Sequence, residues 1–306
     1  MKSSLSIGQA ATLACLWEAT APKPGNVHPH AAFHDTCYAD YLASAVAIGP
    51  AMQHASTCKL GSTILAAVEA TQALVGRNTN LGTILLLAPL ASVCPDTPLR
   101  AGVADVLART DQEDAALLYA AIRTAQPGGM GRVKKMDVHQ TPPDDLMAAM
   151  RAAADRDFVA RQYAENFTPL FDQIVPNLRV LIEQGMSLSD AIVNVHLQTM
   201  HAFPDSLIAR KCGIEVAQET ARRAGEVIAV GPPTSEAYRH AVANLDQYLR
   251  DTQHRRNPGT TADLMAAGLF ILLRDGIITD ACGFHQEADA TRHIERGTFK
   301  MEDHHA

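Results

Sequence analysis

The feature that most constrains the fold is helical periodicity that no strand pattern interrupts. Apolar residues recur three to four positions apart along most of the chain, as in the stripe of Leu170, Ile174, Leu178 and Leu181. Sustained period-two alternation, the mark of a half-buried strand, is absent from the sequence. The sequence therefore predicts an all-α fold, a single multi-helix globular domain with a long central loop.

The helices are separated by turn-like segments that suggest how the domain is organised. Helical patterns are expected over residues 4–20, 38–55, 62–75, 206–229, 234–251 and 261–274. Residues 126–143, rich in Gly and Pro, form the central loop, and Gly128 to Lys135 within it is a candidate flap over a phosphate. We expect a catalytic domain over residues 1–283 and a polar tail over residues 284–306.

Composition excludes several classes of protein. The 306-residue chain is 47% hydrophobic with a net charge of −7, which allows a large core and argues against general nucleic-acid binding. The longest apolar stretch, Leu81 to Val93, is too short to cross a bilayer, so no membrane partner is expected. None of the six cysteines has CxxC spacing, which predicts reduced core thiols and a cytoplasmic location.

The densest polar motif follows the first predicted helix. It reads Lys23-Pro24-Gly25-Asn26-Val27-His28 and continues to Phe33-His34-Asp35. The prolines prevent a helix, Lys23 can reach a phosphate, and Asp35 is a hard oxygen ligand suited to Mg²⁺. In the alternative interpretation, Asp35 only caps the helix that begins near Tyr38, and the histidines are surface side chains.

Three further polar turns stand at predicted helix starts. Asn78-Thr79-Asn80 precedes Gly82, where free backbone N–H groups could bind an anion. Asp205 is followed one turn later by Arg210. Asp263 is the third residue after Thr260, a spacing that also fits a capping box. Capping alone would explain each of these residues.

One electrostatic argument links the carboxylates. Helix N-termini attract phosphate, whereas carboxylates at the same place repel it. Asp35, Asp205 and Asp263 fit beside a polyphosphate only when Mg²⁺ lies between them, because Mg²⁺ is typically held by one or two carboxylates together with phosphate oxygens and water. The pattern predicts a magnesium–nucleotide site where the loops converge.

In this order, the motifs resemble those of the triphosphoribosyl-dephospho-CoA synthase family over roughly residues 10 to 275. The family has KPGxVD, HKD, NTHKG, DTN-to-RGG and PGGSADLL segments. The matching segments here begin at Lys23, His34, Asn78, Asp205 and Asn257.

The resemblance implies an ATP-dependent transferase that moves the ribose C1′ of ATP to a hydroxyl of dephospho-CoA and releases adenine. Its partners would be small-molecule nucleotides, with ATP as substrate and Mg²⁺ as cofactor, and a homodimer is left open. It implies catalytic roles for His34, Asp35, Asp205 and Asp263, with the three aspartates also holding the metal. It assigns nucleotide binding to Lys23, Gly25, Arg77, Asn78, Thr79, Asn80, Gly82, Arg210, Gly259 and Thr260.

The chain departs from the family motifs at several positions, which suggests a divergent member. NTHKG is here Asn78-Thr79-Asn80-Leu81-Gly82, His34 replaces the lysine of HKD, and His28 replaces the aspartate of KPGxVD. Two alternatives therefore stay open. One is a Mg²⁺-dependent hydrolase or transferase that acts on another phosphorylated or ADP-ribosyl-like substrate, and the other is a non-catalytic nucleotide-binding protein.

Overall fold

The computed structural model describes residues 5–128, 140–251 and 253–278. Within these residues the chain forms fourteen α-helices and no β-strand, which confirms the all-α prediction. The first seven helices are α1 (Ile7–Thr20), α2 (Tyr38–His54), α3 (Leu60–Val75), α4 (Leu81–Ser92), α5 (Leu99–Ala108), α6 (Gln112–Ala125) and α7 (Leu146–Ala153). The second seven are α8 (Phe158–Ala164), α9 (Val175–Glu183), α10 (Leu188–Ala202), α11 (Ser206–Cys212), α12 (Ile214–Ala229), α13 (Glu236–Leu249) and α14 (Gly259–Arg274).

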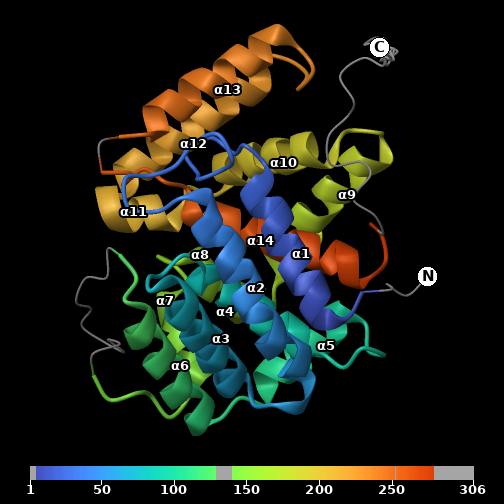
Figure 1. Ribbon diagram of the computed structural model, residues 1–306, viewed down its shortest axis with the longest axis vertical. Coiled ribbons are helices and arrows are strands. Elements are labelled where there is room, and N and C mark those ends of the chain that lie inside the picture. Colours follow the sequence, from blue (N-terminus) through green and yellow to red (C-terminus); the bar gives the residue numbers. More distant parts are fainter. Residues whose placement is uncertain (1–4, 129–139, 252, 279–306) are drawn as a thin grey trace, which may run out of the picture.

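Helix α14 runs through the middle of the molecule, behind α1 and α2 (Figure 1). It packs against α1, α4 and α10. Helices α11, α12 and α13 gather at one end of the molecule, and α3, α6 and α7 at the other (Figure 1). Segments far apart in sequence therefore meet around α4 and α14.

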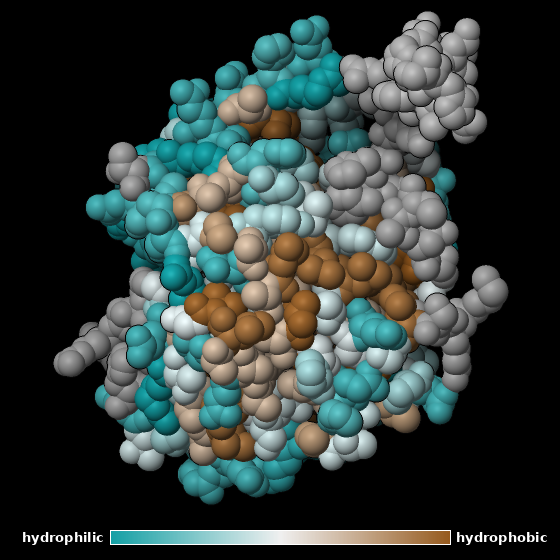
Figure 2. Space-filling model, in the orientation of Figure 1, coloured by the Kyte–Doolittle hydropathy of each residue, from teal (hydrophilic) through white to brown (hydrophobic). Residues whose placement is uncertain are grey.

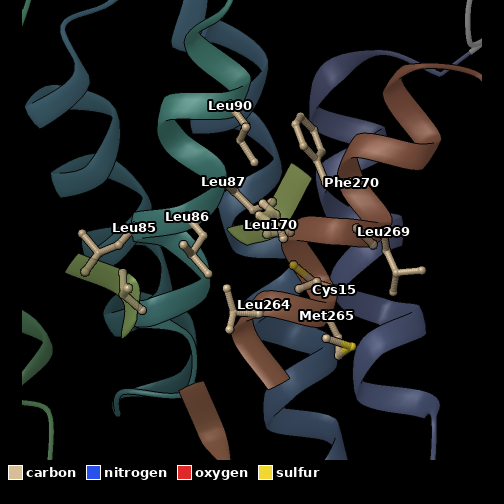
Figure 3. Close-up of a cluster of buried hydrophobic side chains, with 14 of the residues drawn as sticks. Cys15, Leu85, Leu86, Leu87, Leu90, Leu170, Leu264, Met265, Leu269 and Phe270 are labelled. Atoms are coloured by element: carbon tan, nitrogen blue, oxygen red, sulfur yellow. The ribbon is translucent and has the colours of Figure 1, made fainter. Parts of the chain in front are cut away.

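The core is centred on α4 and α14, which are apolar on nearly every side. Leu86 and Leu87 of α4 and Leu264 and Leu269 of α14 are all fully buried, and Figure 3 shows these side chains near Cys15 of α1. A helix that is hydrophobic all round must be surrounded by other elements. The two helices thus form a buried frame on which polar groups can be fixed.

The structure corrects some of the predicted helix boundaries. The pattern over residues 206–229 predicted one helix, but the chain breaks between α11 and α12 at Gly213, whose φ is +95°. Glycine adopts this conformation without the strain that a Cβ would introduce. A short π-helix (η2, Leu170–Ile174) leads into α9 close to Pro176, where the missing backbone N–H disturbs the regular hydrogen-bond pattern.

The surface is mixed in character. Apolar side chains gather at the centre of the face drawn in Figure 2, and hydrophilic ones lie toward the two ends. No helix in the described part of the chain has the length and apolarity needed to cross a membrane. The five cysteines in that part are free thiols. Cys37, Cys58 and Cys94 are exposed, and Cys15 is the only one of the five that is buried, so the prediction of core thiols is confirmed for Cys15 alone.

Candidate functional site

A cavity of about 980 Å³ opens among α1, α2, α4, α6, α7, α8, α11 and the start of α14. This volume is at the upper end of the range for small-molecule sites. Apolar side chains from α6, α7 and α8 form part of the wall, and polar and charged groups form the rest. The cavity can therefore hold a large, partly charged ligand.

Asp263 projects into this cavity from the second turn of α14. The capping-box interpretation of this residue is wrong, because α14 begins at Gly259 and Asp263 lies inside the helix. Its Oδ1 atom accepts a hydrogen bond of 2.5 Å from the Thr83 hydroxyl of α4. Its Oδ2 atom lies above Gly82, where an added Cβ would come within 2.0 Å of it. Gly82 thus makes room for the carboxyl group.

The surroundings of Asp263 favour its protonated form. Burial is the largest cause that raises its pKa, to about 8, and the negative charges of Glu18 and Asp205 add to the effect. The hydrogen bond from Thr83 acts in the opposite direction. Since Asp263 also lines the cavity, a carboxyl group that can exchange a proton near neutral pH faces the ligand space.

Glu18 is a second acidic group in the cavity wall, and no sequence motif predicted it. It is the only charged residue of α1, where it faces the cavity one turn after Cys15. A lone charge in an otherwise uncharged helix was the signal that could have revealed it. The Glu18 side chain is 13% exposed and its Oε1 atom lies 2.9 Å from Nζ of Lys23.

Lys23 has a different place from the predicted one. Its side chain is fully buried and does not line the cavity. Its ammonium group donates to the backbone carbonyls of Glu18 and Ala21 and pairs with the Glu18 carboxylate. Because these partners occupy the ammonium, the structure does not present Lys23 to a phosphate.

Asp205 acts as a helix cap and as a link between two helices. Its Oδ1 atom accepts from the backbone N–H groups of Leu207 and Ile208 at 2.9 and 3.0 Å. Its Oδ2 atom accepts from the backbone and the hydroxyl of Thr261 at 2.8 and 2.7 Å. The carboxylate is 2% exposed and absent from the cavity wall. These four bonds fasten α11 to the start of α14.

His34 and Asp35 lie on an exposed loop outside the cavity wall. The His34 ring stacks on His254 with centroids 5.2 Å apart. Asp35 does not cap α2, whose N-cap is Cys37. The charge of Asp35 is nevertheless felt by Lys211 and by Tyr41 of α2. His34 and Asp35 therefore lie near the cavity but do not line it.

The segment from Asn78 to Gly82 lines the cavity, as do Gly259 and Thr260. Thr79 Oγ1 is 2.5 Å from the Ser44 hydroxyl, and Asn78 accepts a hydrogen bond from the backbone N–H of Leu81 at 3.1 Å. Gly25 is not in the wall. It adopts a φ of +78° and donates its N–H to Asp246, and an added Cβ would contact Leu249 at 2.8 Å.

Of the side chains predicted to bind phosphate through a positive charge, only Arg210 lines the cavity. Arg77 is exposed and lies outside the cavity. Arg210 lines the cavity and pairs with Asp157 at 3.3 Å. Lys211, the next residue, also lines the cavity. No hydrogen bond or ion pair with another described residue engages its ammonium. Burial, followed by the charge of Arg210, lowers the pKa of Lys211.

His28, which stands where the KPGxVD motif has an aspartate, carries no charge at neutral pH. Burial is the largest cause that lowers its pKa to about 4, and the nearby Arg250 adds to the effect. The loop that holds His28 is anchored by Arg250, which donates to the carbonyl of Asn26 at 2.6 Å. The substitution thus removes a negative charge from this loop.

The three predicted metal ligands do not converge. Among the residues that the structure describes, no group of three or more His, Cys, Asp or Glu side chains could hold a metal ion. Asp205 is used by four hydrogen bonds and Asp35 is exposed, so only Asp263 of the three reaches the cavity. The donor set does not fit the predicted three-aspartate magnesium site. Of the predicted flap, only Gly128 lies within the described residues, where it lines the cavity.

Comparison with known proteins gives concordant results. The family model described as ATP:dephospho-CoA triphosphoribosyl transferase matches residues 4–279. A curated protein of Pseudomonas savastanoi pv. phaseolicola, named as a 2-(5''-triphosphoribosyl)-3'-dephosphocoenzyme-A synthase, is 34% identical over 113 residues. That match spans 37% of this chain and 38% of the relative.

A solved structure has the same fold. It is the crystal structure of a protein from Archaeoglobus fulgidus, named as a triphosphoribosyl-dephospho-CoA synthase. The superposition covers 77% of this chain and 99% of the other, with a TM-score of 0.61 and 25% sequence identity.

Proposed function

Because the chain belongs to the ATP:dephospho-CoA triphosphoribosyl transferase family, we propose that it transfers the triphosphoribosyl group of ATP to dephospho-CoA. In this reaction a hydroxyl oxygen of the acceptor forms a bond to C1′ of the ribose, and the bond from C1′ to adenine breaks. The proton of the hydroxyl is lost and adenine gains one. The triphosphate remains in the product.

The observation that carries the proposal is the position of Asp263. It is a carboxyl group in a large cavity with a pKa near neutrality, at about 8. Transfer of a ribosyl group passes through an oxocarbenium-like centre, and carboxyl groups on either side of that bond are the usual catalysts of glycosyl transfer. A carboxylate that only capped a helix or lay on the surface would not be expected to line a cavity or to have a raised pKa.

Arg210 and Lys211 are the proposed ligands of the triphosphate. Both line the cavity, and the Lys211 ammonium has no hydrogen-bond or ion-pair partner among the described side chains. A partly buried cation without a counter-ion is stabilised when an anion binds beside it. The triphosphate would supply that anion.

Asn78, Thr79 and Thr260 are the proposed partners of the ribose and of the acceptor. They bring amide and hydroxyl groups to the same cavity from two separate helix starts. Such groups orient a sugar through hydrogen bonds without adding charge. The apolar wall from α6 and α7 would take the uncharged parts of the two substrates.

Mg²⁺ is proposed only as an ion bound to the triphosphate. Mg²⁺ commonly keeps several waters and binds phosphate oxygens with few protein ligands. The transfer derived above does not depend on a protein-held metal. The predicted metal roles of Asp35 and Asp205 find no support in the arrangement of their side chains.

The direct test is to incubate the protein with ATP, Mg²⁺ and dephospho-CoA, and to follow adenine by chromatography and the coupled product by mass spectrometry. The proposal expects both products in equal amounts, and expects Asp263→Asn to form both about 10²–10⁴-fold more slowly. Free triphosphoribose in the absence of an acceptor would identify a hydrolase instead. ATP binding that survives in Asp263→Asn, with no turnover in the natural protein, would favour a non-catalytic protein.

A further inference from the structure

We propose that Glu18 and Asp263 divide the two proton transfers of this reaction, with Glu18 accepting the proton of the acceptor hydroxyl and Asp263 donating a proton to the departing adenine. The inference rests on the proposed function and goes beyond it, because it assigns separate roles to two carboxyl groups. It also gives Lys23 the role of a positioning residue for Glu18.

The first ground is geometric. Glu18 comes from α1 and Asp263 from α14, two helices that pack together, and both side chains line the same cavity. The charge of Glu18 raises the pKa of Asp263, and both carboxylates act on Cys15 and Tyr41. The two carboxyl groups are therefore neighbours that face one ligand space.

The second ground is that the two carboxyl groups have different partners, a charged one for Glu18 and an uncharged one for Asp263. Lys23 places a buried ammonium 2.9 Å from Glu18 Oε1, so Glu18 has a cationic partner. Asp263 forms no ion pair with any residue in the described part of the chain, and its hydrogen bond comes from the uncharged hydroxyl of Thr83. Environments that separate two carboxyl groups in this way commonly assign one as base and the other as acid.

The other titratable groups around Asp263 do not reverse this assignment. Cys15 on α1 and Tyr41 on α2 have pKa values raised mainly by burial, so both stay protonated and uncharged at neutral pH. Asp205, at the start of α11, raises the pKa of Asp263 further. The charged groups that act on Asp263 thus favour its neutral, proton-donating form.

The proton balance closes over one turnover. The hydroxyl oxygen of the acceptor bonds to C1′ while its proton passes to the Glu18 carboxylate. The electrons of the C1′–N bond leave with adenine, which takes the proton of Asp263. Glu18 ends neutral and Asp263 ends ionised, so transfer of one proton from Glu18 to Asp263 restores the starting state.

The test uses two donors, ATP and 7-methyl-ATP. The base of 7-methyl-ATP is already cationic and leaves without needing a proton. We expect Asp263→Asn to slow transfer from ATP by about 10²–10⁴-fold, the usual range for lost acid–base catalysis, and to leave transfer from 7-methyl-ATP within about tenfold of the natural protein. Glu18→Gln should slow transfer from both donors by about 10²-fold or more. Equal losses of Asp263→Asn with both donors would overturn the assignment.

The role of Lys23 is tested by measuring whether its substitution changes kcat or KM. Lys23→Met should lower kcat and leave the KM for ATP nearly unchanged, and Lys23→Arg should restore much of kcat. A raised KM for ATP with unchanged kcat would show a phosphate ligand and would contradict the positioning role. Because Glu18→Gln leaves a buried ammonium unpaired, the double variant Glu18→Gln/Lys23→Met serves as a folding control that should recover stability without recovering activity. Glu69→Gln on the exposed face of α3 is the matched control.

An infrared titration of the free protein separates this inference from the proposed function. Protonated and ionised carboxyl groups absorb at different frequencies, so a protonated carboxyl band that disappears near pH 8 should be present in the natural protein. The band should be missing in Asp263→Asn and should titrate at lower pH in Glu18→Gln. Its absence from the natural protein would overturn the proton assignment whatever the activity. Failure to release adenine with a normal band would instead refute the proposed reaction.

Discussion

Replacing Asp263 with asparagine should stabilise the folded protein while it destroys activity. The raised pKa means that folding penalises the ionised carboxylate. From an ordinary value of 3.8 to about 8 the difference is about 4 units, which at about 1.4 kcal/mol per unit corresponds to a ceiling of about 6 kcal/mol. Water in the cavity and local relaxation reduce this ceiling, and we expect a gain of about 2–4 kcal/mol at neutral to alkaline pH.

The pH dependence gives the sign of this effect. Below about pH 4 the carboxyl is protonated in both the folded and the unfolded chain, so Asp263→Asn should change stability little. Between about pH 4 and pH 8 the unfolded chain ionises while the folded one keeps its proton, so the natural protein loses stability relative to the variant. Above about pH 8 the difference should level off.

The assay is denaturant unfolding of both proteins at a series of pH values, supported by thermal melts, in which 1 kcal/mol is worth about 2 °C in a chain of this size. Glu69→Gln, whose carboxylate is exposed, should show no such trend. A difference between Asp263→Asn and the natural protein that does not grow from acid to neutral pH would refute the reasoning. It would mean that the Asp263 carboxylate is ionised and well solvated in the cavity.

Three further outcomes follow from contacts at the site. Gly82→Ala should lower activity by at least about tenfold, measured as adenine release, because its Cβ would approach Asp263 Oδ2 to 2.0 Å and displace the carboxyl. Lys211→Met should weaken ATP binding about tenfold or more by calorimetry, since a charged hydrogen bond is worth about 1.5–3 kcal/mol, whereas Lys59→Met, remote from the cavity, should not. Asp205→Asn should cost about 2 kcal/mol or more in urea unfolding, because its amide cannot accept both bonds from Thr261, and an unchanged midpoint would contradict the capping role.

Most of the fold could be predicted from the sequence because helical periodicity is a local signal. The boundaries of α2 and α14 fall within two residues of their predicted positions. The break at Gly213 was missed because a single glycine does not reveal its φ angle. Apolar residues on both sides of it continue the helical pattern.

The site was harder to predict because the decisive signal is tertiary. Asp205 and Asp263 both have the sequence spacing of helix caps. Only the observed start of α14 shows that Asp205 is a cap and that Asp263 is a carboxyl group in the cavity. Glu18 lies in a helix without a motif, and its importance depends on Lys23 being buried. Lys23 and Asp35 were placed in one motif by sequence, yet the first turns into the core and the second toward solvent.

The close approach of α4 and α14 at Gly82 has a consequence for where this protein accepts substitutions. Asp263 extends from α14 and is hydrogen-bonded to Thr83 of α4, and both helices are almost wholly interior, whereas His28 and His34 belong to a peripheral loop. Substitutions in that loop should therefore be tolerated without displacing Asp263 from the cavity, whereas substitutions in the interior helix pair should not.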